Sequence, residues 1–327
     1  MEFRLDEGQI ELQQTVARFC TDRFPFDRIA GREGAAVDRS AWTELAGLGV
    51  LGLLLPEASG GVGLGVIEAA IVFEQLGSHL VPGPVLWSLL AAPLVPGAAT
   101  GEVLVGGVEA SAVVDGTVVV AHARDIDVLL VVGDDGVTAH RTADLPDPTP
   151  YEPLDPLTSV GRFTGLGSGE PIGAGGAAAH LRPLGTVLTA ALLAGVSSRA
   201  LDVAREYALE REQFGAAIGS FQAIKHLLAD MYVRTVSAQS VTYAAAAVLD
   251  EPGDDDVRRA VARAKVLASD AAIANSSAAI QVLGGMGFTW DMLPNHLLKR
   301  AWLLEHDFGT TEAHELHLGS TLEGARS

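Results

Sequence analysis

Cysteine is almost absent from this sequence, since Cys20 is the single one in 327 residues. An internal disulfide is therefore excluded, and a reducing compartment fits the composition. No leader is expected either, because the first residues, MEFRLDEGQIELQQ, are acidic and amphipathic rather than basic and then apolar. The most apolar runs, TVLTAALLAGV and VLWSLLAAPLV, are shorter than the ~20 residues that span a bilayer. These absences predict a soluble, cytoplasmic protein without a membrane partner.

Positive charge is also scarce. The chain has 41 aspartate and glutamate residues against 22 lysine and arginine residues, which gives a formal net charge of −19. A body this acidic repels nucleic acid and anionic membrane surfaces, so neither is expected as a partner. An anionic ligand must instead be held by locally placed arginines and by the N-termini of helices. Hydrophobic residues make up 48% of the chain, enough for two or three domains with packed cores.

The pattern of hydrophobic and turn-forming residues changes twice along the chain. Residues 1–98 show helical periodicity with glycine-rich joints, and Gly77 is expected to end the helix VIEAAIVFEQLGS. Residues 99–178 hold short valine-rich runs separated by GG, DG and DDG, a pattern typical of β-hairpins. Residues 179–327 are helical almost throughout. Their helices are expected at 185–211, 221–250, 256–284 and 292–306, with a shorter one at 311–322. The prediction is an α+β fold with an N-terminal helical domain, a small middle β domain and a C-terminal four-helix bundle.

Two motifs in the helical part have the composition of a ligand site. In YALEREQFGAAIGSFQAIKHLLADM, one helix ends at Arg211 and the next begins at Phe221-Gln222, with glycines between them. An arginine, free backbone amides and an amide side chain at such a corner suit a pyrophosphate. In AIQVLGGMGFTW, Gly284 and Gly285 would let a ligand approach the backbone closely. Taken alone, each motif is equally consistent with a plain helix–loop–helix corner.

Together, in this order and spacing, the two motifs resemble the acyl-CoA dehydrogenase family. The amino-terminal stretches FRLDEGQIELQQTVARF and WTELAGLGVLGLLLPEASGGVGLGVIEAAIVFEQLG fit the same family, so the resemblance covers nearly the whole chain. The stretch GGMGFTWDMLPNHLLKRA is similar to an actinobacterial subgroup that acts on branched and steroid-derived acyl-CoA thioesters. The resemblance implies a flavoprotein that oxidises an acyl-CoA to the 2,3-enoyl-CoA and passes electrons to an electron-transfer acceptor. It also implies FAD at a subunit interface, and hence an oligomer.

The resemblance assigns cofactor-binding roles by motif position. Four residues match those that hold the FAD diphosphate and adenosine of a neighbouring subunit: Arg211, Gln213, Phe221 and Gln222. Three match a second FAD-contacting segment and one a third, in FGTT: Gln281, Gly284, Gly285 and Thr310.

The chain also departs from the family pattern. It has neither the Thr-Glu-Pro motif nor the tryptophan-centred strand with which the β domain of family members touches the flavin ring. The two family positions of the catalytic glutamate hold Phe308 and Gly185. Asp307 is the one nearby acid, and a thioester that shields it would raise its pKa toward useful basicity. Asp307 is therefore the candidate catalytic base within this chain.

Three functions remain open on this reading. The first is one subunit of a heteromeric α2β2 acyl-CoA dehydrogenase whose partner supplies the missing motifs. The second is a homo-oligomeric dehydrogenase that uses Asp307, and the third is a non-catalytic scaffold subunit. A flavin monooxygenase on the same architecture is a remoter alternative.

The stretch EHDFGTTEAHELH, residues 305–317, raises the question of a metal site because it concentrates histidines and acids. His314 and His317 are three residues apart on one helix face, a spacing common on solvated helices, so no metal is expected. Thr310 or Thr311 is expected to cap the last helix.

Overall fold

The computed structural model describes residues 5–30, 34–173, 176–253 and 256–324. The chain forms two compact units. The bundle unit comprises residues 1–31, 70–81 and 186–327, and the sheet unit comprises residues 32–69 and 82–185. The predicted division into three domains at residues 98 and 178 stays a prediction.

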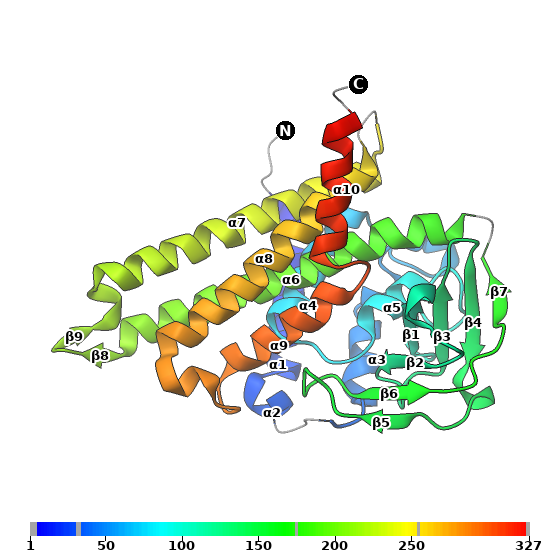
Figure 1. The fold of residues 1–327 in the computed structure, drawn as a ribbon, viewed down its shortest axis with the longest axis horizontal. Helices are drawn as coiled ribbons and strands as arrows, with labels where there is room; N and C mark the ends of the chain where they lie inside the picture. Colours follow the sequence, from blue (N-terminus) through cyan, green and yellow to red (C-terminus); the bar gives the residue numbers. More distant parts are fainter. Residues whose placement is uncertain (1–4, 31–33, 174–175, 254–255, 325–327) are drawn as a thin grey trace. The chain divides into compact units, whose positions relative to one another are not determined.

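Long helices dominate the bundle unit (Figure 1). Its elements are α1 (Glu7–Arg23), α2 (Phe26–Ala30), most of α4 (Val66–Ser78), most of α6 (Ala177–Glu210), α7 (Gln222–Asp250), α8 (Val257–Leu283), η6 (Gly284–Phe288), α9 (Leu293–His306) and α10 (Thr311–Gly324). A short hairpin of β8 (Glu212–Gln213) and β9 (Ala216–Ala217), followed by η5 (Ile218–Ser220), joins α6 to α7. The predicted helices are confirmed, and α6 begins eight residues earlier than expected, at Ala177 rather than 185.

Among the residues that the structure describes, two helical segments are long and apolar enough to span a membrane. They are α6 and residues 257–288, but 78% and 56% of their most apolar windows are buried inside the fold. Such burial is what the core helices of a bundle show, so their length and composition are weak evidence for a membrane span.

Glycines let α4 and α6 touch backbone to backbone. A Cβ at Gly77 would overlap the carbonyl group of Leu192, and a Cβ at Gly195 would overlap the carbonyl oxygen of Glu74. The expectation that Gly77 ends its helix is therefore wrong, because α4 continues to Ser78. Gly77 is required by close packing, which a single stretch of sequence does not reveal.

Buried polar groups join the helices of the bundle unit. The Asn275 side-chain nitrogen on α8 lies 2.8 Å from the Ser197 hydroxyl on α6 and 2.9 Å from the Thr235 hydroxyl and the Met231 carbonyl oxygen on α7. All of these side chains are at most 4% exposed. Because a buried amide must find its partners, this cluster fixes the register of the three helices.

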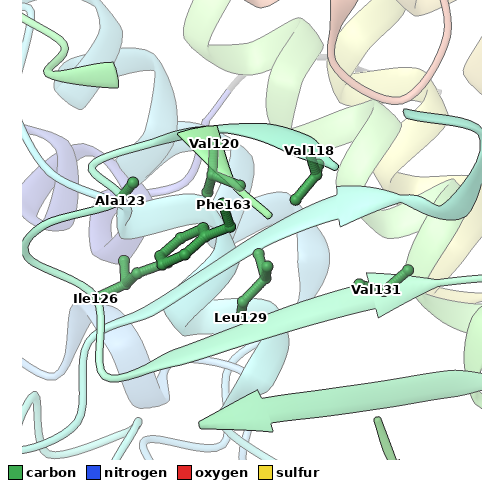
Figure 2. Packing of buried hydrophobic residues seen from close by; sticks show 7 residues of the cluster. All are labelled: Val118, Val120, Ala123, Ile126, Leu129, Val131 and Phe163. Atoms are coloured by element: carbon green, nitrogen blue, oxygen red, sulfur yellow. The ribbon is translucent and has the colours of Figure 1, made fainter. Parts of the chain in front are cut away.

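The sheet unit holds the shorter elements. They are α3 (Arg39–Gly47), η1 (Val50–Gly52), η2 (Glu57–Ser59), α5 (Val85–Ala91), β1 (Val105–Glu109), η3 (Ala110–Ala112), β2 (Val118–Ala121), β3 (Val128–Val132), β4 (Val137–Arg141), η4 (Thr142–Asp144), β5 (Thr149–Tyr151), β6 (Val160–Phe163) and β7 (Glu170–Ile172). One sheet has the order β1-β3-β4-β7, with β1 parallel to β3, and the other has the order β2-β6-β5. Figure 2 shows the core around the ring of Phe163, to which β2, β3 and the loop at Ala123 and Ile126 contribute.

Of the three turn sequences GG, DG and DDG from which hairpins were predicted in this unit, two form turns in the structure. Asp115 and Gly116, both left-handed (φ 48° and 69°), close a tight turn, and residues 133–136 join β3 to β4. The GG pair does not form a turn. Gly106 and Gly107 lie inside β1, where a Cβ would overlap the side chains of Ile126 and Trp87.

Candidate functional site

The hairpin between α6 and α7 exposes an aromatic side chain in a strained turn. Gln213 pairs with Ala216, so Phe214 and Gly215 form the two-residue loop, with φ of 56° and 80°. Such a turn favours asparagine and glycine, yet Phe214 occupies its first position and is 94% exposed. Its ring packs edge to face on the ring of Phe221, with centroids 6.1 Å apart, and the two exposed rings form an aromatic pair at this corner. Sequence reasoning did not single out Phe214.

Arg211 and the start of α7 form a group of hydrogen-bond donors. Arg211 is exposed, and within the described part of the chain its guanidinium has no ion-pair partner. Phe221 precedes α7 in an extended conformation and supplies no side-chain cap, so the first-turn N–H groups of this helix remain available. Gln222 is exposed at the first helical position, whereas Gln213 donates to the Glu212 carbonyl oxygen at 2.8 Å. This donor set fits a diphosphate.

At the carboxyl end of α8, two consecutive glycines leave the backbone uncovered by side chains of their own. Gly284 has φ 65° and ψ −143°, a conformation open only to glycine. A Cβ added at Gly284 or Gly285 would meet no atom within 4 Å, so this backbone faces open space. Gln281 is exposed one turn earlier, and Phe288 follows with 73% exposure. An extended ligand can lie directly against this segment.

The turn between α9 and α10 carries the candidate base. Asp307 ends α9, and Phe308 and Gly309 follow with left-handed backbones of φ 55° and 98°. Thr310 caps α10, because its hydroxyl accepts the N–H of Ala313 at 3.3 Å, as the sequence predicted. The Glu305 carboxylate accepts a hydrogen bond from the Thr311 N–H at 2.6 Å. This contact connects the end of α9 to the first residue of α10 across the turn.

Burial changes the acidity of Asp307. It raises the pKa of this carboxyl from 3.8 to about 6, while the charges of Lys265, His306 and Arg300 oppose the rise. Within the described residues the carboxylate accepts no hydrogen bond. An acid with this pKa is still mostly ionised at neutral pH and is more basic than an ordinary aspartate, as a general base requires.

The two family positions of the glutamate lie in different surroundings. Phe308 is only 8% exposed, so a buried apolar ring occupies the position that the resemblance gives to the carboxylate. Gly185 lies inside α6. Within the described residues no three histidine, cysteine, aspartate or glutamate side chains could hold a metal ion. His314 instead donates from Nε2 to the Phe308 carbonyl oxygen at 3.0 Å.

The predicted site residues fall into two groups on the bundle unit. Because α7 and α8 are antiparallel and of similar length, the end of α8 returns toward the hairpin end of the bundle (Figure 1). Asp307 and Thr310 instead lie on the turn held by Lys265, and Lys265 precedes Leu283 by 18 residues. At 1.5 Å per residue this separates the two groups by about 27 Å along α8. No small pocket of one chain can contain both groups.

Comparisons with known proteins agree with this architecture. Residues 6–99 match the family model described as acyl-CoA dehydrogenase, N-terminal domain, and residues 183–322 match acyl-CoA dehydrogenase, C-terminal domain. The acyl-CoA dehydrogenase IpdE2 of Mycolicibacterium smegmatis is 33% identical over 281 residues, which cover 84% of this chain and 85% of that protein.

Solved structures share the whole fold. The Tcur3481-Tcur3483 steroid ACAD G363A variant has a TM-score of 0.84 at 25% identity, covering 98% of this chain and 99% of that one. The ChsE4-ChsE5 complex from Mycobacterium tuberculosis has a TM-score of 0.81 at 24% identity, covering 99% of both chains, and shows likeness of fold alone.

Proposed function

Because the chain belongs to the acyl-CoA dehydrogenase family, we propose that it takes part in α,β-dehydrogenation of an acyl-CoA as one subunit of a hetero-oligomer. The family consists of flavin oxidoreductases, and FAD is the cofactor. When bound, FAD supplies the acceptor for the hydride that leaves the β-carbon of the acyl group. The observation that carries the proposal is Phe308, an apolar and buried side chain at the position of the family's catalytic carboxylate.

In this proposal the hairpin end of the bundle binds the diphosphate and adenosine of an FAD. Arg211 and the uncapped start of α7 would hold the phosphates, and the bare backbone at Gly284 and Gly285 would lie against the adenosine. The separation of about 27 Å from the Asp307 turn supports two different FAD molecules, one for each group. The FAD at the hairpin end would then be shared with a neighbouring chain.

The proposed partner is a second acyl-CoA dehydrogenase-like subunit in an α2β2 assembly. An apolar stripe on α7 would be covered by another chain, since Tyr232, Val233 and Val236 are 61%, 62% and 39% exposed at helical spacing. The likeness to a structure described as the pair Tcur3481-Tcur3483 also supports a two-chain enzyme. The partner would provide the base and the flavin-ring contacts that this chain lacks.

The proposed substrate is a bulky acyl-CoA, such as a steroid-derived thioester. Support comes from the description of the Tcur3481-Tcur3483 protein as a steroid ACAD, and from the subgroup resemblance of GGMGFTWDMLPNHLLKRA. Electrons would leave the flavin to an electron-transfer acceptor, and we propose a cytoplasmic location.

Co-expression tests the proposal. The chain is produced alone and with a candidate partner subunit, and the flavin absorption band, the mass by light scattering and dye reduction with a panel of acyl-CoAs are recorded. We expect a complex that retains flavin and turns over a steroid-type thioester, and turnover that persists in Asp307→Asn. A lone chain that is yellow and active, and that Asp307→Asn inactivates, would establish a homo-oligomeric enzyme instead. A complex whose activity and flavin content match those of the partner alone would identify a scaffold.

A further inference from the structure

Lys265 is a buried charge whose hydrogen-bond partners are all backbone oxygens. Its side chain on α8 is 0% exposed. The ammonium donates to the carbonyl oxygens of Glu305 at 3.0 Å, Asp307 at 2.5 Å and Gly309 at 2.8 Å. Within the described residues no carboxylate forms an ion pair with it. The three hydrogen bonds satisfy the donors of this buried ammonium, and the nearby charges of Asp307 and Glu305 also favour its charged form.

The three carbonyl groups belong to alternate residues and converge on one point. The left-handed backbones of Phe308 and Gly309 turn the chain so that this is possible. The intervening Phe308 carbonyl points elsewhere and accepts from His314. A turn with alternate carbonyls gathered around one centre is a cation-binding arrangement, and the lysine ammonium is the cation that occupies it.

Only an ammonium matches this arrangement among the side chains. It carries three N–H donors on one atom and no acceptor, whereas a hydroxyl has one donor and an amide has two. The guanidinium of arginine spreads its donors over a planar fork rather than one point. The carboxyl end of α9 adds a favourable field, because helix C-termini attract cations.

We propose that Lys265 is a positioning residue for the turn 305–310, in which its ammonium gathers three carbonyl oxygens and so fixes the directions of Asp307 and Thr310. Its partners lie at least 40 residues away in the sequence, so the contact ties the turn to α8 rather than to its own helix. What the turn does for an acyl-CoA or FAD rests on the proposed function, but the positioning itself does not.

Hydrogen exchange of the isolated chain tests the proposal without flavin or substrate. Lys265→Met keeps the unbranched apolar stem of the side chain, one heavy atom shorter, and removes the three donors. We expect exchange of the amides at 306–311 to rise at least tenfold, with exchange elsewhere in α8 and α9 unchanged. Lys225→Met is the matched control, since Lys225 is exposed on α7, and it should change nothing at 306–311.

Chemical rescue separates positioning from general packing. Lys265→Ala removes three methylenes and the ammonium from the side chain. The cavity that remains has the size of propylammonium, which can fill it. We expect propylamine to restore slow exchange at 306–311 in Lys265→Ala, and 1-propanol, which has the same size without the charge, to fail.

Two results would overturn the proposal. One is exchange at 306–311 in Lys265→Met equal to that of the native chain. The other is an equal rise throughout α8 and α9, or equal rescue by propanol, either of which would make Lys265 a packing residue only. Loss of acyl-CoA dehydrogenase activity in the partner complex would instead bear on the proposed function and leave this exchange result intact.

Discussion

The hydroxyl of Tyr243 donates a hydrogen bond of 2.5 Å to the carboxylate of Glu74, which is buried in the bundle unit at 4% exposure. Gln239 donates to the other carboxylate oxygen at 2.9 Å. Burial raises the pKa of Glu74, while the two hydrogen bonds oppose the rise. The two donors on α7 therefore replace the hydrogen bonds that water would give to the Glu74 carboxyl group on α4. Both donors are neutral side chains.

Removing the phenol oxygen should leave this acid with one donor. We expect Tyr243→Phe to lower the free energy of unfolding by about 1–3 kcal/mol, the cost of leaving a buried acceptor without its donor. Urea unfolding at pH 7 measures the change. Tyr232→Phe on the same helix is the matched control, because Tyr232 is 61% exposed and should change the stability by less than about 0.5 kcal/mol. Equal effects of the two variants would contradict a stabilising role for the Tyr243 hydroxyl.

The contact between α4 and α6 predicts a steric effect at Gly195. A methyl group there would overlap the Glu74 carbonyl oxygen, so Gly195→Ala must push two helix backbones apart. We expect a loss of about 1–3 kcal/mol, as for other overpacked cores. Thermal unfolding of Gly319→Ala gives the comparison.

Gly319 lies in α10, and a Cβ there would meet nothing within 4 Å. Alanine is the better helix former, so Gly319→Ala should be neutral or stabilise by up to about 1 kcal/mol. A neutral Gly195→Ala would show that α4 and α6 can separate without loss of stability.

The order of helices and β segments was predictable, because hydrophobic periodicity and turn residues are local signals. The meaning of single glycines was not. Gly77 has the local signature of a helix end, but its role is set by Leu192 more than a hundred residues away. The same limit applies to Lys265, whose partners at 305–309 are brought to it only by the packing of α9 on α8. The candidate site residues come from motif resemblance rather than from chemistry, and Phe214 is not among them because an exposed left-handed turn cannot be read from a single stretch of sequence.

The raised pKa of Asp307 predicts a pH dependence of stability. This pKa is about 6 in the folded chain against 3.8 for the free side chain, so the folded state holds a proton between these values that the unfolded state has released. The stability that this group contributes is present below about pH 4 and is lost as the pH rises through about 6. Other carboxylates have their own pH dependence, so the difference from Asp307→Asn isolates this one.

We therefore expect Asp307→Asn to gain stability relative to the native chain as the pH rises from 4 to 7. Urea unfolding at pH 4, 5, 6 and 7 measures this difference. A difference that stays constant across the series would mean that Asp307 titrates as an exposed aspartate does, and it would remove the argument for Asp307 as a base.

The exposed hairpin predicts variants that lose cofactor without losing stability. Arg211 makes no ion pair within the described residues, and Phe214 is 94% exposed, so neither contributes much to folding of the single chain. In the assembled complex we expect Arg211→Gln and Phe214→Ser to weaken FAD retention at least tenfold, because a charged phosphate contact and an aromatic contact are lost. The ratio of flavin absorbance to protein after gel filtration, and titration of the apo complex with FAD, measure the effect.

Arg263→Gln is the matched control for this experiment. Arg263 is also exposed and makes no ion pair within the described chain, but it lies on the first half of α8, about 32 Å from Gly284 at 1.5 Å per residue. It should retain FAD as the native complex does. If Arg211→Gln and Arg263→Gln lose flavin to the same extent, the effect is one of overall charge and the hairpin end does not bind the diphosphate. If only the hairpin variants lose it, at an unchanged unfolding temperature, the strained Phe214-Gly215 turn is explained by the cofactor of a neighbouring chain.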